Sequence, residues 1–435
     1  MTTELAKAWE LFDSGDPQGA MRTLRFAADA LPSAEIAPLV EKLAQGVGFA
    51  DLAAASAALT ADPAGAGALY EFGYACIGRG VSHLAVPALR EALRLALAPR
   101  RGLLGRARRT PAPRQVLLEL AVALEDEQRH AEAVGLLQEH DGLTEDWPDR
   151  YLLVHNALMD GQVDLGRQVF GALGDPDETW RPAAERIRHL LARATVATPV
   201  DRQDLRGWHY TLTGGLLTTV SPAGFHQGMT GRWAYLQDDF GACRHGLERL
   251  RAVLAAMDRK PASVALLPDR GSRALGLAAA RILGLPTAPY RPGTADTLVV
   301  AYDLNECDQE LVAQLHDRAP GEVLYEHATC WTDPPAVPAD VSTLLVQTVI
   351  APWASRMRFT EDGERDDIPA DERSAEELAD AICAADPEPD AGDDDAPADP
   401  DELLVAFAVR VNATWLTGAR DRVRSSGPVP SSRFA

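Results

Sequence analysis

Small residues recur at a nearly constant interval through the N-terminal half of the chain. They stand at Ala20, Ala53, Ala85, Ala133 and Gly166. Three of the four intervals are about 33 residues, a length typical of stacked helix pairs. One such pair cannot bury its own apolar face, so several pairs must stack to form a core. This repeat constrains the fold of the N-terminal half more than any other feature of the sequence.

The interval from Ala85 to Ala133 exceeds one repeat by about fifteen residues. The surplus corresponds to a stretch rich in Arg, Gly and Pro at 99–114. We expect a solvated basic loop between two repeats, because exposed charge runs usually have that role. Docking of an acidic partner on this loop is the alternative.

Apolar residues, large and small, precede these positions in a similar order. Examples are Leu69, Phe72, Gly73 and Cys76 before Ala85, and Leu117, Leu120, Ala121 and Leu124 before Ala133. This order resembles the tetratricopeptide repeat. The resemblance implies an α-solenoid at 1–198, closed by a helix at 182–197, whose concave surface holds a protein or peptide partner or the second half of the chain. An irregular, alanine-rich helical bundle is the alternative.

A strand, a tight loop and a helix follow one another at 264–284. The apolar run Val264–Leu267 predicts a buried strand, Ser272 is the expected N-cap, and Gly284 the expected helix end. A loop that enters a helix N-terminus can hold an anion. The candidate ligand-binding residues are Asp269, Arg270, Gly271, Ser272 and Arg273. Alternatively, Arg270 is a surface residue and Gly271 a turn residue.

Further apolar runs surround this unit. We expect a β-hairpin at 208–220 around Gly214-Gly215, a strand at 232–237 and a helix that reaches Met257. Further strands are expected at 287–290, 297–304, 323–328 and 341–350, and a helix at 308–316. The predicted fold class is therefore α plus α/β: a TPR-like α-solenoid followed by an α/β domain at 205–355 with a mainly parallel sheet.

Ligands of parallel sheets bind at the carboxyl ends of the strands, which selects 268–273, 303–306 and 327–331. The order of these pieces resembles type I phosphoribosyltransferases. P-D-R-G-S-R takes the place of the pyrophosphate loop, and Asp303 that of the second acidic residue, but Tyr302 replaces the first and no Thr-Gly follows. The resemblance implies a phosphate or nucleotide pocket, or a diverged enzyme that uses Arg270, Gly271 and Asp303.

Asp303 and Glu306 are the candidate catalytic residues, as a general base or as metal ligands. Carboxylates that cap the following helix are the alternative. His209 and His226 are expected to be structural, and Cys307, His327 and Cys330 lack the pattern of a zinc site, so no metal site is predicted. The sequence identifies no cofactor. A scaffold whose α/β half binds no ligand is the third hypothesis.

The net charge of −22 is concentrated in one segment. Nineteen acidic and two basic residues lie at 360–402, which predicts disorder apart from a short helix at 375–384 behind a capping box at Ser374. A helix at 403–424 should return to the α/β domain. The charge argues against nucleic-acid and membrane partners, and the scattered cysteines favour a cytoplasmic protein.

Overall fold

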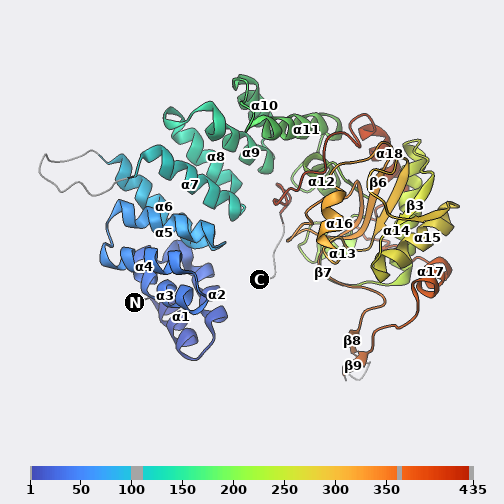
Figure 1. Ribbon diagram of the computed structural model, residues 1–435, viewed down its shortest axis with the longest axis horizontal. Helices are drawn as coiled ribbons and strands as arrows, with labels where there is room; N and C mark the ends of the chain where they lie inside the picture. The colour runs from blue at the N-terminus through green and yellow to red at the C-terminus, as the bar shows by residue number, and fades with distance from the viewer. Residues whose placement is uncertain (1, 99–110, 360–364, 431–435) are drawn as a thin grey trace, which may run out of the picture. The chain divides into compact units, whose positions relative to one another are not determined.

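A computed structural model describes residues 2–98, 111–359 and 365–430 (Figure 1). The chain divides into two compact units, Met1–Trp180 and Arg181–Ala435, which we call the first and the second unit. The first is helical, and the second is built on a mostly parallel sheet. None of the described helices combines the length and the apolarity needed to cross a membrane.

The first unit is a succession of helices joined by short connections (Figure 1). Each helix packs mainly against its neighbours in the sequence, as expected for stacked helix pairs. The helices are α1 (Thr3–Asp13), α2 (Pro17–Ala27), α3 (Ser33–Gly46), α4 (Ala50–Ala61), α5 (Ala66–Gly78), α6 (Ser82–Leu97), α7 (Pro113–Asp126), α8 (His130–Glu139), α9 (Tyr151–Met159) and α10 (Val163–Ala172).

The recurring small residues lie in the second helix of each successive pair. They are buried, in α2, α4, α6, α8 and α10. In α5, a Cβ atom at Gly73 would come within 2.6 Å of the Leu89 side chain, so α5 and α6 meet where no larger residue fits. The resemblance to tetratricopeptide repeats stays a prediction, and residues 99–110 of the expected basic loop lie outside the described residues.

We predict that Gly73→Leu destabilises the chain by about 1–3 kcal/mol, because the new side chain overpacks the contact with Leu89. Gly135→Leu in α8 is the matched control, since a Cβ atom there meets nothing within 4 Å. Urea unfolding of the full-length chain, followed by far-ultraviolet circular dichroism, measures both variants. Equal midpoints for the two variants would contradict the proposed close contact.

The second unit contains a seven-stranded sheet in the order β1-β7-β6-β5-β3-β4, with β2 also paired to β7. Every pairing in this sheet is parallel. Its strands are β1 (Leu216–Leu217), β2 (Trp233–Gln237), β3 (Ser263–Leu266), β4 (Thr287–Pro289), β5 (Thr297–Ala301), β6 (Val323–Cys330) and β7 (Val341–Ile350). The strands expected at 232–237, 264–267, 287–290, 297–304, 323–328 and 341–350 are thus confirmed, within a few residues at their ends.

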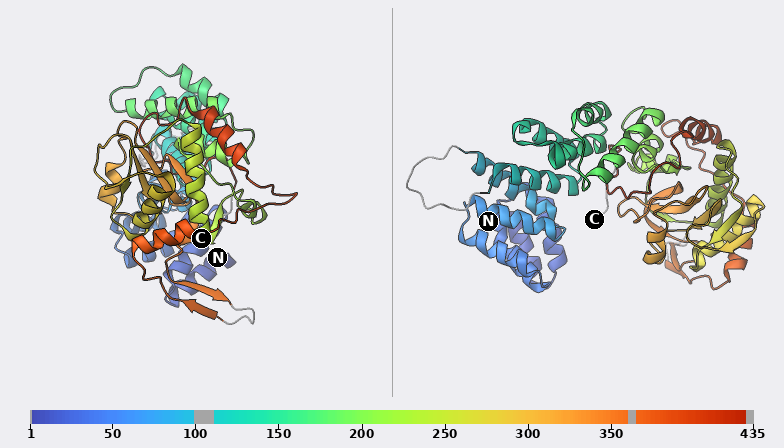
Figure 2. Two further views of the ribbon diagram at one scale, coloured as in Figure 1. Left: turned by 90° about the vertical axis from the view of Figure 1, so that its right-hand side faces the viewer. Right: turned by 45° about the horizontal axis from the view of Figure 1, so that its top comes forward.

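Helices cover both faces of the sheet. Alternate residues of β3, β5 and β6 pack under α14 (Phe240–Ala256), α15 (Arg270–Leu283) and α18 (Asp401–Val411). The other residues of these strands pack against α16 (Gln309–Gln314). The helices α14 and α18 lie side by side (Figure 2). The expected parallel sheet with two covered faces is therefore present.

Three local expectations differ from the structure. Residues 205–213 form a helix, α12 (Leu205–Thr213), and not the first strand of a hairpin. Asp204 caps this helix and Gly214 ends it in the left-handed conformation, so turn signals that suit a hairpin here bound a helix. The helix α11 (Arg181–Ala197) packs on α12 and α18 and belongs to the second unit, whereas we expected it to close the helical array.

The third difference concerns the acidic segment. Strand β8 (Arg356–Phe359), just before this segment, pairs antiparallel with β9 (Arg365–Ile368) inside it; α17 (Ala375–Ala384) and a loop at 386–399 follow. The predicted capping box at Ser374 is confirmed. Leu378 and Ile382 are buried where α17 packs on α15, so a few apolar side chains order a segment whose composition predicts disorder. Residues 360–364 lie outside the described residues.

Candidate functional site

The predicted anion-binding loop lies at the N-terminus of α15, where its groups already have partners. Asp269 is the N-cap in place of the expected Ser272, and its carboxylate accepts a hydrogen bond of 2.7 Å from the Ser272 amide. The Ser272 hydroxyl is buried and accepts from the Tyr302 amide at 3.0 Å. A Cβ atom at Gly271 would lie 2.8 Å from the Trp353 ring. The glycine permits a close approach, as expected, but by an indole and not by a ligand.

The two arginines of this loop hold the acidic segment. The Arg270 guanidinium donates to the backbone carbonyls of Asp371 and Arg373. Arg273 forms an ion pair of 3.0 Å with Glu376 at the start of α17. An anion at the N-terminus of α15 would have to displace the Asp269 carboxylate and compete with the acidic segment for both arginines. The structure thus gives this loop a docking role for α17.

The candidate catalytic carboxylates follow β5 as expected, but they lie in a turn. Asp303 is half-buried and accepts a hydrogen bond from the Asn305 amide at 2.8 Å, while Glu306 is exposed. The N-cap of α16 is neither of these but Asp308. Burial, and to a lesser degree Glu306, raise the pKa of Asp303 to about 6.

A neighbouring carboxyl group, Glu326 in β6, is fully buried. It accepts hydrogen bonds from the Leu304 amide and from the Thr329 hydroxyl. Burial first, and then the charge of Asp303, raise the pKa of Glu326 to about 8. At neutral pH this side chain is therefore largely a protonated carboxylic acid in the folded chain.

We predict that Glu326 makes the folded chain less stable as pH rises. An unfolded glutamate has a pKa of about 4.3, so between that pH and about 8 the folded chain holds the proton more tightly. The free energy of unfolding then falls by up to about 1.4 kcal/mol per pH unit. Glu326→Gln should flatten this fall, and exposed Glu306→Gln should not. Urea midpoints measured across this pH range test it, and parallel curves for wild type and Glu326→Gln would refute it.

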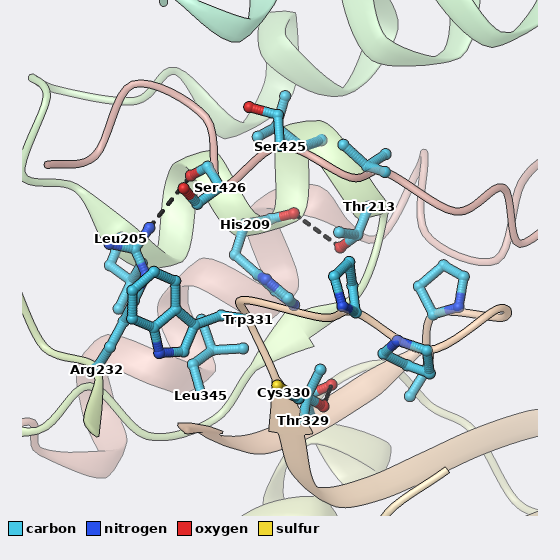
Figure 3. A pocket seen from close by; sticks show the side chains of 17 residues that line it. Leu205, His209, Thr213, Arg232, Thr329, Cys330, Trp331, Leu345, Ser425 and Ser426 are labelled. Atoms are coloured by element: carbon cyan, nitrogen blue, oxygen red, sulfur yellow. Dashed lines mark hydrogen bonds between the residues drawn. The ribbon is translucent and has the colours of Figure 1, made fainter. Parts of the chain in front are cut away.

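A small cavity lies between α12, the end of β6 and the C-terminal segment (Figure 3). His209 points into it, and burial together with Arg232 lowers the pKa of His209 to about 4, so the imidazole is neutral. Arg232 donates to the Ser426 and Val429 carbonyls. The volume of about 60 Å³ suits a few water molecules better than an organic ligand, whose pockets measure about 300–1,000 Å³.

A larger pocket of about 490 Å³ opens where the edge of the sheet is divided. Strand β1 pairs with β7 at Val341 and Ser342, and β2 pairs with β7 from Val346 onward. The chain leaves the sheet between β1 and β2, so the edge beside Thr343 and Leu344 lacks a continuous strand, and these two residues line the pocket. The pocket is therefore a product of the topology.

Carboxylates predominate among the charged groups that line this pocket. Asp239 stands at the start of α14, and four more acidic residues come from the acidic segment: Asp386, Glu388, Asp390 and Asp399. Two basic residues of α14, His245 and Arg249, and the indole of Trp233 in β2 complete the chemistry-bearing groups. Burial, followed by the charge of Arg249, lowers the pKa of His245, so its ring is neutral at pH 7. We call the loop at 386–399, which closes the pocket, the acidic strap.

Asp399 fastens the acidic strap. Its carboxylate lies 2.6 Å from Arg206 of α12 and 2.9 Å from Arg249 of α14, and it accepts from the Val220 amide at 3.0 Å. Its side chain is 11% exposed. Burial alone would raise the pKa of Asp399, but the two guanidiniums hold it below the usual value. The charge of Arg249 is thereby neutralised inside the pocket wall.

We predict that Asp399→Ala costs about 3–5 kcal/mol, because two buried guanidiniums lose their shared partner. The residual pairing of Arg249 with Asp401 places the cost toward the lower end. Asp386→Ala, at an exposed position of the same loop, should change stability by no more than about 0.5 kcal/mol. Chemical unfolding of the full-length chain gives both values. A similar small loss for the two variants would show that Asp399 does not fasten the strap.

Sequence reasoning missed this pocket. Its residues come from β2, α14, β7 and the acidic strap, which no local pattern connects. One signal was available, namely acidic residues adjoining a predicted helix start at Asp238-Asp239. The structure does not bring Cys307, His327 and Cys330 together as one group of ligands. Cys307 contacts Ser272, Cys330 contacts Thr332, and His327 contacts Asp238. His226 forms an exposed pair with Asp393.

Comparison with known proteins adds no family to this description. No protein-family model matches the chain, and a search of curated proteins found no match. The chemistry of the pocket therefore carries the functional argument.

Proposed function

We propose that the second unit binds a small organic cation, such as an amine or a guanidinium compound, in the pocket under the acidic strap. The observation that carries this proposal is the composition of the wall: five carboxylates line a pocket of about 490 Å³. Of the two basic residues there, Arg249 is paired with Asp399 and Asp401, and His245 is uncharged. The wall therefore presents a net negative field to a ligand.

Two further groups suit a cation. The indole of Trp233 is half-buried in the wall, and an aromatic face attracts ammonium and guanidinium groups. The neutral imidazole of His245 can accept a hydrogen bond from an N–H group of the ligand. The volume suits a ligand of metabolite size. These features favour an elongated or branched amine over a bare metal ion.

This proposal replaces the anion pocket expected from the sequence. The phosphate hypothesis depended on Arg270 and Arg273, and both arginines hold the acidic segment. No observation in the described part of the chain favours phosphoribosyl transfer. The docking of a protein or peptide partner on the first unit stays a prediction, as does the scaffold hypothesis.

Isothermal titration with spermidine, agmatine, arginine and choline tests the proposal, with pyrophosphate as the anionic comparison. At least one amine should bind, and its affinity should fall with added salt because the wall is partly exposed. The paired change Asp386→Asn with Glu388→Gln should weaken that amine roughly fivefold to thirtyfold, equivalent to about 1–2 kcal/mol.

The matched control is Asp394→Asn with Asp395→Asn. These residues belong to the same strap and carry the same charge, but they do not line the pocket. Equal weakening by both pairs would reduce the effect to general attraction by an acidic chain. Binding of pyrophosphate in preference to every amine would refute the proposal.

A further inference from the structure

Three side chains that commonly bind metal ions meet under α14, apart from the pocket under the acidic strap. Asp238 follows β2, Cys243 lies in the first turns of α14, and His327 belongs to β6. All three are buried, with Asp238 1% exposed and the other two fully enclosed. Asp238 Oδ2 lies 3.0 Å from His327 Nε2 and 3.5 Å from Cys243 Sγ, and Sγ lies 3.7 Å from Nε2.

Hydrogen bonding alone serves this cluster poorly. Oδ2 of Asp238 would accept from Cys243, from His327 and from the Tyr302 hydroxyl at 2.8 Å. Its companion oxygen, Oδ1, is buried and has no hydrogen-bond partner among the described residues. Buried polar atoms are nearly always paired, so three donors on one oxygen and none on the other call for an explanation.

A tetrahedral metal ion explains the arrangement. Zinc lies about 2.3 Å from a thiolate and about 2.0–2.2 Å from imidazole nitrogen and carboxylate oxygen, which puts such ligand atoms about 3.3–3.6 Å apart. The three separations of 3.0, 3.5 and 3.7 Å scatter around these values. Sulfur and nitrogen ligands beside one carboxylate favour zinc over magnesium or calcium. We propose that Asp238, Cys243 and His327 form a buried zinc site, in which the Asp238 carboxylate binds through both oxygens and distorts the tetrahedron.

The surroundings support metal binding by the histidine. Tyr325 OH lies 3.3 Å from His327 Nδ1 and 2.7 Å from the Thr343 hydroxyl. A proton on Nδ1, donated to this hydroxyl, leaves the Nε2 lone pair for the metal, as supporting hydrogen bonds do in metal sites. Gly246 provides the space for this hydrogen bond, because a Cβ atom there would lie 3.0 Å from Nδ1. Binding converts the Cys243 thiol to a thiolate and releases one proton to solvent.

The site would join three elements, since its ligands come from the end of β2, from α14 and from β6. Full burial and the absence of a solvent-facing ligand position among the described residues indicate a structural and not a catalytic role. The inference is independent of the proposed binding of an amine under the acidic strap. It also differs from the sequence-based expectation, in which no metal was predicted because no short motif connects these residues.

Metal analysis of the full-length chain, free of any affinity tag and dialysed against metal-free buffer, tests the site. We expect about one zinc ion per chain. Cobalt substitution should give a thiolate-to-cobalt charge-transfer band and the intense visible bands of tetrahedral Co²⁺. Cys243→Ala should abolish both. Tyr325→Phe should weaken zinc binding about tenfold to hundredfold, the usual cost of losing a supporting residue.

Cys307→Ala is the matched control. Its thiol is also buried and lies 3.5 Å from a carboxylate oxygen of Asp269. Among the described residues, no histidine joins these two groups to make a set of three potential metal ligands. This variant should keep zinc and the cobalt spectrum. The proposal is overturned if the wild type retains no zinc, if Cys243→Ala retains as much as the wild type, or if bound cobalt shows no thiolate band. Should Cys243→Ala fail to fold, the wild-type cobalt spectrum decides alone.

Discussion

The ion pairs of Asp399 with Arg206 and Arg249 fix the position of the acidic strap beside the sheet. Both guanidiniums are buried, and each also donates to the Thr218 carbonyl. Two buried positive charges require a carboxylate, and the chain supplies it from a residue about two hundred positions after Arg206. Removal of the carboxylate or of a guanidinium would leave an uncompensated buried charge, so these ion pairs hold α12, α14 and the strap together.

The attachment through Asp399 changes the role of the acidic residues in the folded chain. A segment with so many carboxylates would repel itself in isolation, and its composition is that of a disordered chain. With the segment fastened at Asp399 and docked through α17, several of these carboxylates form one wall of a pocket, and that of Glu376 pairs with Arg273. A source of repulsion in the isolated segment thereby becomes a negatively charged pocket wall in the folded unit.

The features that sequence reasoning predicted correctly have local causes. The strand, loop and helix at 264–284 follow from an apolar run, a breaking loop and a terminal glycine, and all three lie where expected. Gly73 belongs to the predicted repeat, and the structure places it at a close contact with Leu89. Asp and Ser are both good N-cap residues, so the sequence alone does not choose between Asp269 and Ser272. The loop geometry makes Asp269 the N-cap of α15.

The features that were missed have causes far apart in the sequence. The pocket under the acidic strap requires β1 and β2 to share β7, and the proposed zinc site requires Asp238 and His327 to meet across the intervening strand β7. No spacing rule encodes these pairings. The strap was mistaken for a disordered segment because its composition does not reveal that two buried arginines elsewhere need its carboxylate.

The division of the sheet edge between β1 and β2 also bears on self-association. An uninterrupted edge strand offers a ladder of amides and carbonyls onto which another chain can add. Here that edge consists of strands of two and five residues with a detour between them. The opposite edge is β4, three residues long and ending in Pro289, which has no amide proton to donate. Neither edge can template a long intermolecular strand, so the break that opens the pocket also guards the sheet against aggregation.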